Sequence, residues 1–305
     1  MLLDGVMLLW FVQVVIAVAF VAIDIRATPE AVVMKWGFVI ITAFSGLFGA
    51  LLYVLSCREP LPGTHEQYVA AKWRQVVGST MHCVAGDGIG ILVAAVVTAG
   101  IGIPMWADVL CEYGFGFLFG WTVFQALFMR SMFGTYGTSL RHTFMTELLS
   151  MNAVMGGMTA VMVPWMSHDA GAMHPSGARF WFVMSVSLCA GFLVALPMNW
   201  WLVDRGLKHG MMTVRHDAKP LPQASAAAVA GAALTETTFR TRLRHDPGSP
   251  AAVPAPSPQD AGHGHHDMRP TTSRTRLGWM TLVSFAVFGV GFLVAGLLGD
   301  LSMQR

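Results

Sequence analysis

The chain has 305 residues, of which 54% are hydrophobic and only 12% are charged, and its mean hydropathy is +0.57. A soluble globular domain carries about 25% charged residues, so this composition excludes that class and indicates a protein solvated by lipid. The formal net charge of +2 is small, and we expect a lipid bilayer rather than a nucleic acid as its partner.

Seven apolar segments are long enough to cross a bilayer, which takes about 20 apolar residues. Each is a continuous run rather than an alternating one, so we predict helices and not the strands of a membrane barrel. The fold class is therefore all-α, an integral membrane helical bundle of about seven transmembrane helices. In chain order the segments are residues 6–23, 33–55, 82–103, 108–129, 144–164, 178–203 and 277–298.

The connections divide the chain into parts. Between the second and third segments Pro60 and Pro62 interrupt the chain, and Trp73 between two basic residues suits the membrane surface. Before the last segment the chain is rich in Ala, Pro, Ser and Gly and cannot bury a core. We expect two transmembrane helices (1–56), an interfacial amphiphilic connection (57–81), a four-helix membrane core (82–212), a disordered cytoplasmic linker (213–276) and a C-terminal transmembrane helix (277–305).

Basic residues predict the orientation, because loops on the cytoplasmic side are richer in Lys and Arg. If seven helices cross and the N-terminus is cytoplasmic, 15 of the 19 Lys and Arg fall on the cytoplasmic side. We therefore predict an N-terminus in the cytoplasm and a C-terminus outside.

The third segment opens with polar groups where a membrane span normally holds only hydrocarbon. Cys83 and Asp87 are four residues apart and share one face of a helix, with His82 at its edge. Thiolate, imidazole and carboxylate together can hold a transition metal. The alternative is that Asp87 bonds a neighbouring helix, which would fit the small residues Gly86 and Gly90 on the same segment.

The fifth segment carries a carboxylate followed by four thioethers. Glu147, Met151, Met155, Met158 and Met162 fall on one side of a helix. Thioether sulfur suits Cu(I), and a ladder of weak sites would let an ion move on. The alternative is packing, because Met commonly fills gaps in a core.

Other polar residues and one Met are candidates for two sites because they lie at similar depths in the predicted spans. Three residues share the cytoplasmic third of their spans with Cys83 and Glu147, and four lie near the opposite face as an external capture zone. The first set is Gln125, Met198 and Asn199. The second set is Cys111, Glu112, His168 and His174.

Several activities leave no trace in the sequence. It has no Walker loop, no Rossmann fingerprint, no Cys-x-x-Cys pair and no His-Glu-x-x-His zinc helix. We therefore predict no enzymatic activity, and ATP-driven pumping within this chain is excluded.

Several short motifs occur together: His82-Cys83-x-x-Gly86-Asp87, Phe124-Gln125, Glu147 with Met155-Gly156-Gly157-Met158, Phe180-Trp181-Phe182, and Pro197-x-Asn199-Trp200-Trp201-Leu202 followed by Gly206-x-Lys208. Together they resemble a bacterial and archaeal multi-pass membrane family catalogued as a domain of unknown function (DUF4396-like). The resemblance covers about residues 80–212. It implies a place in a bacterial or archaeal cytoplasmic membrane but no reaction.

Three functional hypotheses remain open. The leading one is a protein that binds or transports a soft transition metal ion, copper as Cu(I) in particular, through the Cys/His/Asp cluster and the Met ladder. The second is a non-catalytic scaffold or assembly partner of a respiratory or metalloenzyme complex, with another membrane protein or a second copy as its partner. The third is a proton-coupled solute carrier.

Overall fold

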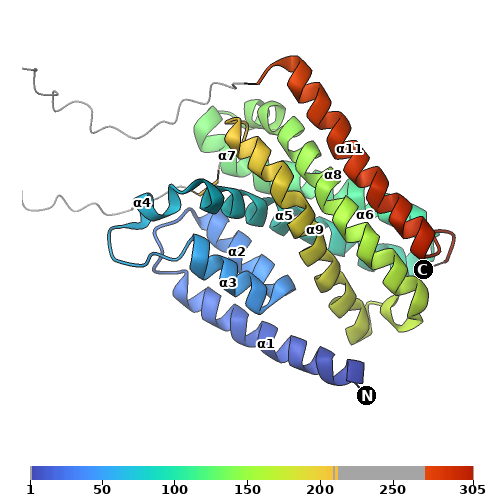
Figure 1. The fold of residues 1–305 in the computed structure, drawn as a ribbon. Coiled ribbons are helices and arrows are strands. Elements are labelled where there is room, and N and C mark those ends of the chain that lie inside the picture. Colours follow the sequence, from blue (N-terminus) through green and yellow to red (C-terminus); the bar gives the residue numbers. More distant parts are fainter. Residues whose placement is uncertain (1, 209, 212–271, 305) are drawn as a thin grey trace, which may run out of the picture. The chain divides into compact units, whose positions relative to one another are not determined.

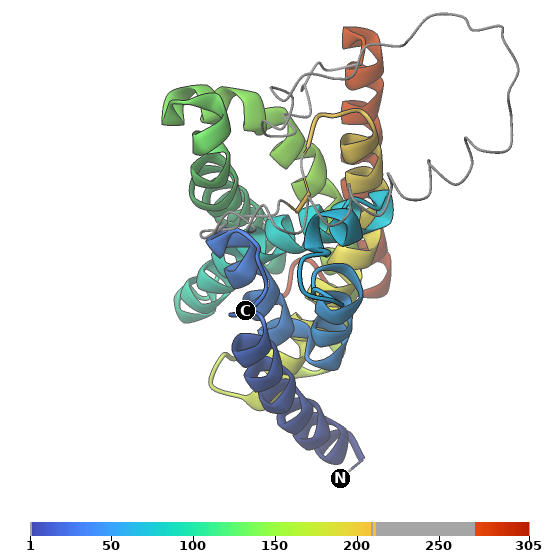
Figure 2. The ribbon, with the colours of Figure 1, turned by 90° about the vertical axis from the view of Figure 1, so that its left-hand side faces the viewer.

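The computed structural model describes residues 2–208, 210–211 and 272–304, which belong to one compact unit, and the elements there are helices (Figures 1 and 2). The predicted all-α membrane bundle is thereby confirmed. In chain order the elements are α1 (Leu2–Asp24), α2 (Val32–Ser45), α3 (Leu47–Ser56), α4 (His65–Val69), α5 (Lys72–Ile101), α6 (Met105–Phe119), the π-helix η1 (Gly120–Gln125), α7 (Ala126–Phe133), α8 (Tyr136–His168), the 3-10 turn η2 (Ala170–Ala172), α9 (Ala178–Asp204) and α11 (Arg274–Leu298).

Six stretches of the described chain are long enough to cross a membrane. Five are single helices that are also sufficiently apolar, namely α1, α5, α8, α9 and α11. The sixth is the unbroken run from α6 through η1 to α7, residues 105–133, in which the π-helix adds one wide turn without ending the helix. These six stretches correspond to six of the seven predicted segments.

The remaining segment, residues 33–55, is not a single spanning helix. Gly46 has a φ of +59° and breaks it into α2 and α3, whose lengths of 14 and 10 residues correspond to about 21 and 15 Å. The Tyr53 hydroxyl at the end of α3 donates to Asp24 at the end of α1 over 2.8 Å. The segment therefore doubles back as a re-entrant hairpin, and both of its ends lie on one face of the bundle.

The tip of this hairpin lies against α1. The Leu47 backbone N–H donates to the Gln13 side chain over 2.6 Å, halfway along α1. Non-helical backbone is tolerated at membrane depth only where protein or water satisfies its polar groups, and Gln13 does so here.

The hairpin changes the predicted arrangement of the termini. Contacts place the two ends of the described chain on one face of the bundle. Asp4 near the N-terminus pairs with Arg179 at the start of α9 over 3.6 Å, and the Asp300 N–H after α11 donates to Ser167 near the end of α8 over 2.8 Å. The described contacts therefore do not support termini on opposite faces, because the apolar segment 33–55 forms a hairpin instead of one long helix.

Helix boundaries also differ from the predicted ones. α5 begins at Lys72, so the last ten residues of the predicted interfacial connection are its first turns. α8 begins at Tyr136 because the Thr135 side chain accepts the Thr138 N–H and caps it. Most of the predicted linker 213–276 lies outside the described residues, and α11 begins inside its last part, at Arg274.

Glycines bring α5 and α6 into close contact. A Cβ at Gly90 would lie 2.8 Å from the Gly116 Cα, and one at Gly86 would lie 3.1 Å from the Gly120 Cα. The backbones of α5 and α6 therefore touch through paired glycines, as small residues in membrane helices permit. This contact brings the polar residues of α5 to η1.

Candidate functional site

Two buried carboxyl groups meet where α5, η1 and α8 come together. A Cβ at Gly120 would overlap Asp87 Oδ1 and would lie 2.8 Å from Glu147 Oε1. Both acidic residues are completely buried, and one carboxyl oxygen of each, Asp87 Oδ1 and Glu147 Oε1, borders the space that a Cβ at Gly120 would fill. Because two ionised carboxylates cannot accept from each other, a hydrogen bond between these groups would require a proton on one of them. Gly120 therefore leaves the space in which a carboxyl pair forms.

Lys208 brings a positive charge to this pair from the segment after α9. Its Nζ lies 3.8 Å from Glu147 Oε2 and donates to Asn199 Oδ1 over 2.9 Å. Asn199 is itself held by Ser150 on α8. Burial lowers the pKa of Lys208, whereas Cys83 and Glu147 raise it, and the net direction is upward.

The predicted residues of α5 and η1 lie beside the carboxyl pair. Cys83 Sγ is 3.3 Å from Glu147 Oε2 and 3.9 Å from Gln125 Oε1. Gln125 is the last residue of η1, whose wide turn reaches towards α5. The His82 ring packs on Phe128 with a centroid separation of 4.9 Å, so it lies at the edge of the cluster. The structure therefore brings Cys83, Gln125 and Glu147 together, as their similar depths in the predicted spans indicated.

Two further carboxyl groups occupy the same face of α6, nearer the face that holds the termini. Asp108 and Glu112 precede Gly116 and Gly120 at intervals of four residues, and both are completely buried. The Thr98 hydroxyl of α5 donates to Asp108. Glu112 is eight residues from Gly120, or about 12 Å along the helix axis. Acidic groups therefore occur at several depths of the α5–α6 contact.

The four methionines of the predicted ladder are fully buried in the hydrophobic core. Met151, Met155, Met158 and Met162 share it with aliphatic and aromatic side chains from the neighbouring helices, as does Met198. This position agrees with packing, and an ion pathway along them stays a prediction.

The four residues of the predicted external capture zone are dispersed. Glu112 is buried between α5 and α6, and Cys111 beside it is half-buried. His168 and His174 are exposed around the α8–α9 connection, where the His168 ring lies 2.7 Å from the Pro164 carbonyl. The described contacts do not unite them.

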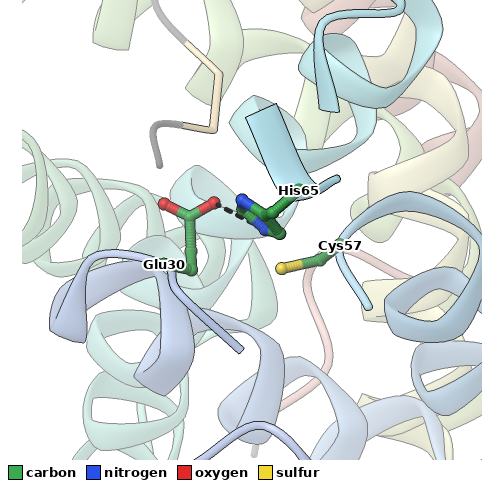
Figure 3. Close-up of side chains that lie close together, drawn as sticks. All are labelled: Glu30, Cys57 and His65. Atoms are coloured by element: carbon green, nitrogen blue, oxygen red, sulfur yellow. Dashed lines mark ion pairs between the residues drawn. The ribbon is translucent and has the colours of Figure 1, made fainter. Parts of the chain in front are cut away.

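Sequence reasoning missed a second cluster, formed by Glu30, Cys57 and His65 (Figure 3). One ligand atom from each lies within 4.8 Å of the other two, and all three residues are buried. Glu30 Oε2 and His65 Nε2 are 4.0 Å apart. Burial raises the pKa of the Cys57 thiol, and Glu30 raises it further, so the thiol is neutral at neutral pH. No spacing in the sequence signals this cluster, because only the hairpin brings residue 57 back to residue 30.

Comparison with known proteins gives one match. Residues 72–208 fit the family model described as "Domain of unknown function (DUF4396)". The similarity covers 137 of the 305 residues. No curated protein and no solved structure matches it. The DUF4396 match runs from the first residue of α5 to Lys208, so it contains the whole cluster of Asp87, Glu147 and Lys208. The Glu30–Cys57–His65 cluster lies outside it.

Proposed function

We propose that the DUF4396 domain moves protons across the membrane, with the Asp87–Glu147 pair as its proton-binding site and Lys208 as a fixed counter-charge. The observation that carries this proposal is the meeting of two buried carboxyl groups at Gly120, with a buried amine 3.8 Å from one of them, Glu147. Acidic and basic groups inside a membrane are expensive and commonly mark ion pathways or proton relays.

Charge balance explains why a proton belongs there. Two ionised carboxylates beside one ammonium group leave one uncompensated negative charge in a buried site, which is costly. One proton on the pair makes the cluster neutral. Loss of that proton recreates the buried charge, so proton uptake and release is the elementary step that this arrangement favours.

The acidic residues of α6 supply a route to one face. Glu112 lies between the pair and Asp108, and Asp108 lies in the first turn of α6, near the face that holds the termini. On the other side Lys208 follows the end of α9. The gap of about 12 Å between Glu112 and Gly120 is longer than one hydrogen bond, so transfer across it requires water or side-chain movement.

Basic residues support an orientation for this route. Of the 12 described Lys and Arg, all but Arg179 belong to the face where α1, α3 and α9 end. The positive-inside rule makes that face cytoplasmic. The re-entrant hairpin strengthens the bias, because it places Arg26 and Lys35 on the same side as Arg58. Both termini would then lie outside the cytoplasm.

Cu(I) binding remains a second candidate, favoured by the 3.3 Å approach of Cys83 Sγ to Glu147. The amine of Lys208 weakens it, because a cation beside Glu147 repels a metal ion. Among the described residues, the core cluster also does not gather three His, Cys, Asp or Glu ligand atoms as closely as Glu30, Cys57 and His65 do.

Proteoliposomes that hold the full chain and a trapped pH dye test the proposal. An imposed membrane potential should drive protons inward faster than in protein-free vesicles. Asp87→Asn and Glu147→Gln should each slow this flux on the order of 100-fold, as expected when a proton-transferring group is lost. Asp87→Asn can still donate a hydrogen bond to Glu147, so it should fold. Glu66→Gln on the exposed surface of α4 is the matched control.

Two results would contradict the proposal. Wild-type flux equal to that of empty vesicles would do so, and so would full flux in both carboxyl variants. Uptake of Cu(I) that Cys83→Ser abolishes, without any proton flux, would favour the copper candidate instead.

A further inference from the structure

We infer that Glu30, Cys57 and His65 form a binding site for a divalent transition metal ion, with Zn²⁺ as the best match. The site lies outside the DUF4396 domain, where the α1–α2 loop, the end of α3 and the start of α4 meet (Figure 3). It shares no residue with the proton-binding cluster, so the two proposals can fail separately.

The distances suit a small ion. In a tetrahedral zinc site with bonds of about 2.0–2.3 Å, neighbouring ligand atoms are about 3.3–3.8 Å apart. The Glu30 and His65 atoms are 4.0 Å apart, and the three ligand atoms lie within 4.8 Å of one another. Small rotations of the side chains would bring them to bonding distance around one ion.

The sulfur, nitrogen and oxygen ligand atoms of the three residues favour Zn²⁺ over other metal ions. Thiolate sulfur, imidazole nitrogen and carboxylate oxygen are the three protein ligand types of zinc sites. Ca²⁺ and Mg²⁺ prefer oxygen ligands only, and Cu(I) prefers sulfur ligands over a carboxylate. A set of three leaves a fourth position for water. Complete burial of the three residues also shields bonds to the ion from solvent competition.

Hydrogen bonds from neighbouring groups hold the three segments that carry Glu30, Cys57 and His65 in place. Glu30 Oε1 accepts the Ala31 N–H over 2.9 Å, which leaves Oε2 turned to His65. Thr28, two residues before Glu30, is bonded to the Tyr53 hydroxyl of α3 over 2.9 Å. The Glu59 side chain accepts the His65 backbone N–H over 3.1 Å. Such supporting bonds orient metal ligands and increase affinity. A bound ion would tie the hairpin to α4.

Co²⁺ is a suitable probe, because thiolate ligation of this ion gives a charge-transfer absorption band. The full chain, purified in detergent and stripped with a chelator, should bind one Co²⁺ with that band and lose it when Zn²⁺ is added. Cys57→Ser should abolish the band. Glu30→Gln, which keeps the shape of the side chain, should bind Zn²⁺ at least about 10–100-fold more weakly, the loss that removal of a supporting partner alone can cause.

Cys83→Ser and Cys189→Ser are the matched controls, because these thiols lie elsewhere in the bundle, and both should keep the band. Gel filtration checks that each variant is folded. If Cys57→Ser does not fold, the Zn²⁺ affinity of Glu30→Gln tests the inference instead. Absence of the band in the wild-type protein would overturn the inference. So would a band that survives in Cys57→Ser, or unchanged Zn²⁺ affinity in Glu30→Gln.

Discussion

The Nζ atom of Lys208 lies 3.8 Å from the Glu147 carboxylate, and both side chains are almost completely buried. Replacing Lys208 by Met would leave the Glu147 charge without its partner. Removal of one member of a buried ion pair costs about 3–5 kcal/mol. We therefore expect Lys208→Met to lower the free energy of unfolding by that amount, measured by SDS titration in mixed micelles.

Two comparisons isolate the pair. Lys208→Met with Glu147→Gln removes both charges and should be more stable than Lys208→Met alone. Lys72→Met removes an exposed partner of Asp204 and should cost less than about 1 kcal/mol. Equal losses in Lys208→Met and Lys72→Met would show that Glu147 does not depend on a buried amine.

Gly120 can be tested by adding one methyl group. A Cβ there would overlap the Asp87 carboxyl and press on Glu147, whereas Gly114 on α6 has no atom within 4 Å of its added Cβ. Gly120→Ala should cost about 1–3 kcal/mol, as overpacking does, and should lower proton flux in vesicles. Gly114→Ala should leave the flux unchanged and should not lower stability. Normal flux and stability in Gly120→Ala would remove the argument for a tight carboxyl pair.

The depth of polar residues in the sequence predicted much of the central cluster. Cys83, Gln125, Glu147 and Asn199 were expected at one level because each lies at a similar distance along its span, and rigid helices convert such distances into shared depth. The paired glycines of α5 and α6 could be recognised in the same way. Their pairing fixes which helices touch, and so which polar groups meet.

Other parts could not be derived, because they depend on where the chain turns. Residues 33–55 have the length of a span, and nothing in their hydropathy distinguishes a crossing from a hairpin. Gly46 became decisive only through its positive φ and the bond that Gln13 makes beside it. Lys208 follows the end of α9, where a Lys normally faces lipid head groups or water. Its inward course reflects tertiary contacts with Asn199 and Glu147.

Gln13 is predicted to stabilise the hairpin tip. Its side chain accepts the Leu47 N–H over 2.6 Å and packs against Gly46. Gln13→Leu leaves that backbone donor unsatisfied within the membrane, which should cost about 1–3 kcal/mol in SDS titration. Gln67→Leu on the exposed side of α4 is the control and should be nearly neutral. A neutral result for Gln13→Leu would mean that the hairpin tip is satisfied by another group.

The position of the termini gives the last prediction. Single cysteines at the exposed positions Leu2, Arg26, Glu66 and Ser302 can be labelled with an impermeant maleimide in intact cells, since the four native thiols are buried or half-buried. Leu2→Cys and Ser302→Cys should react from outside. Arg26→Cys and Glu66→Cys should react only after the membrane is opened, because the α2–α3 hairpin returns to the cytoplasmic face. Labelling of positions 26 and 66 from opposite sides would show that residues 33–55 cross the membrane after all.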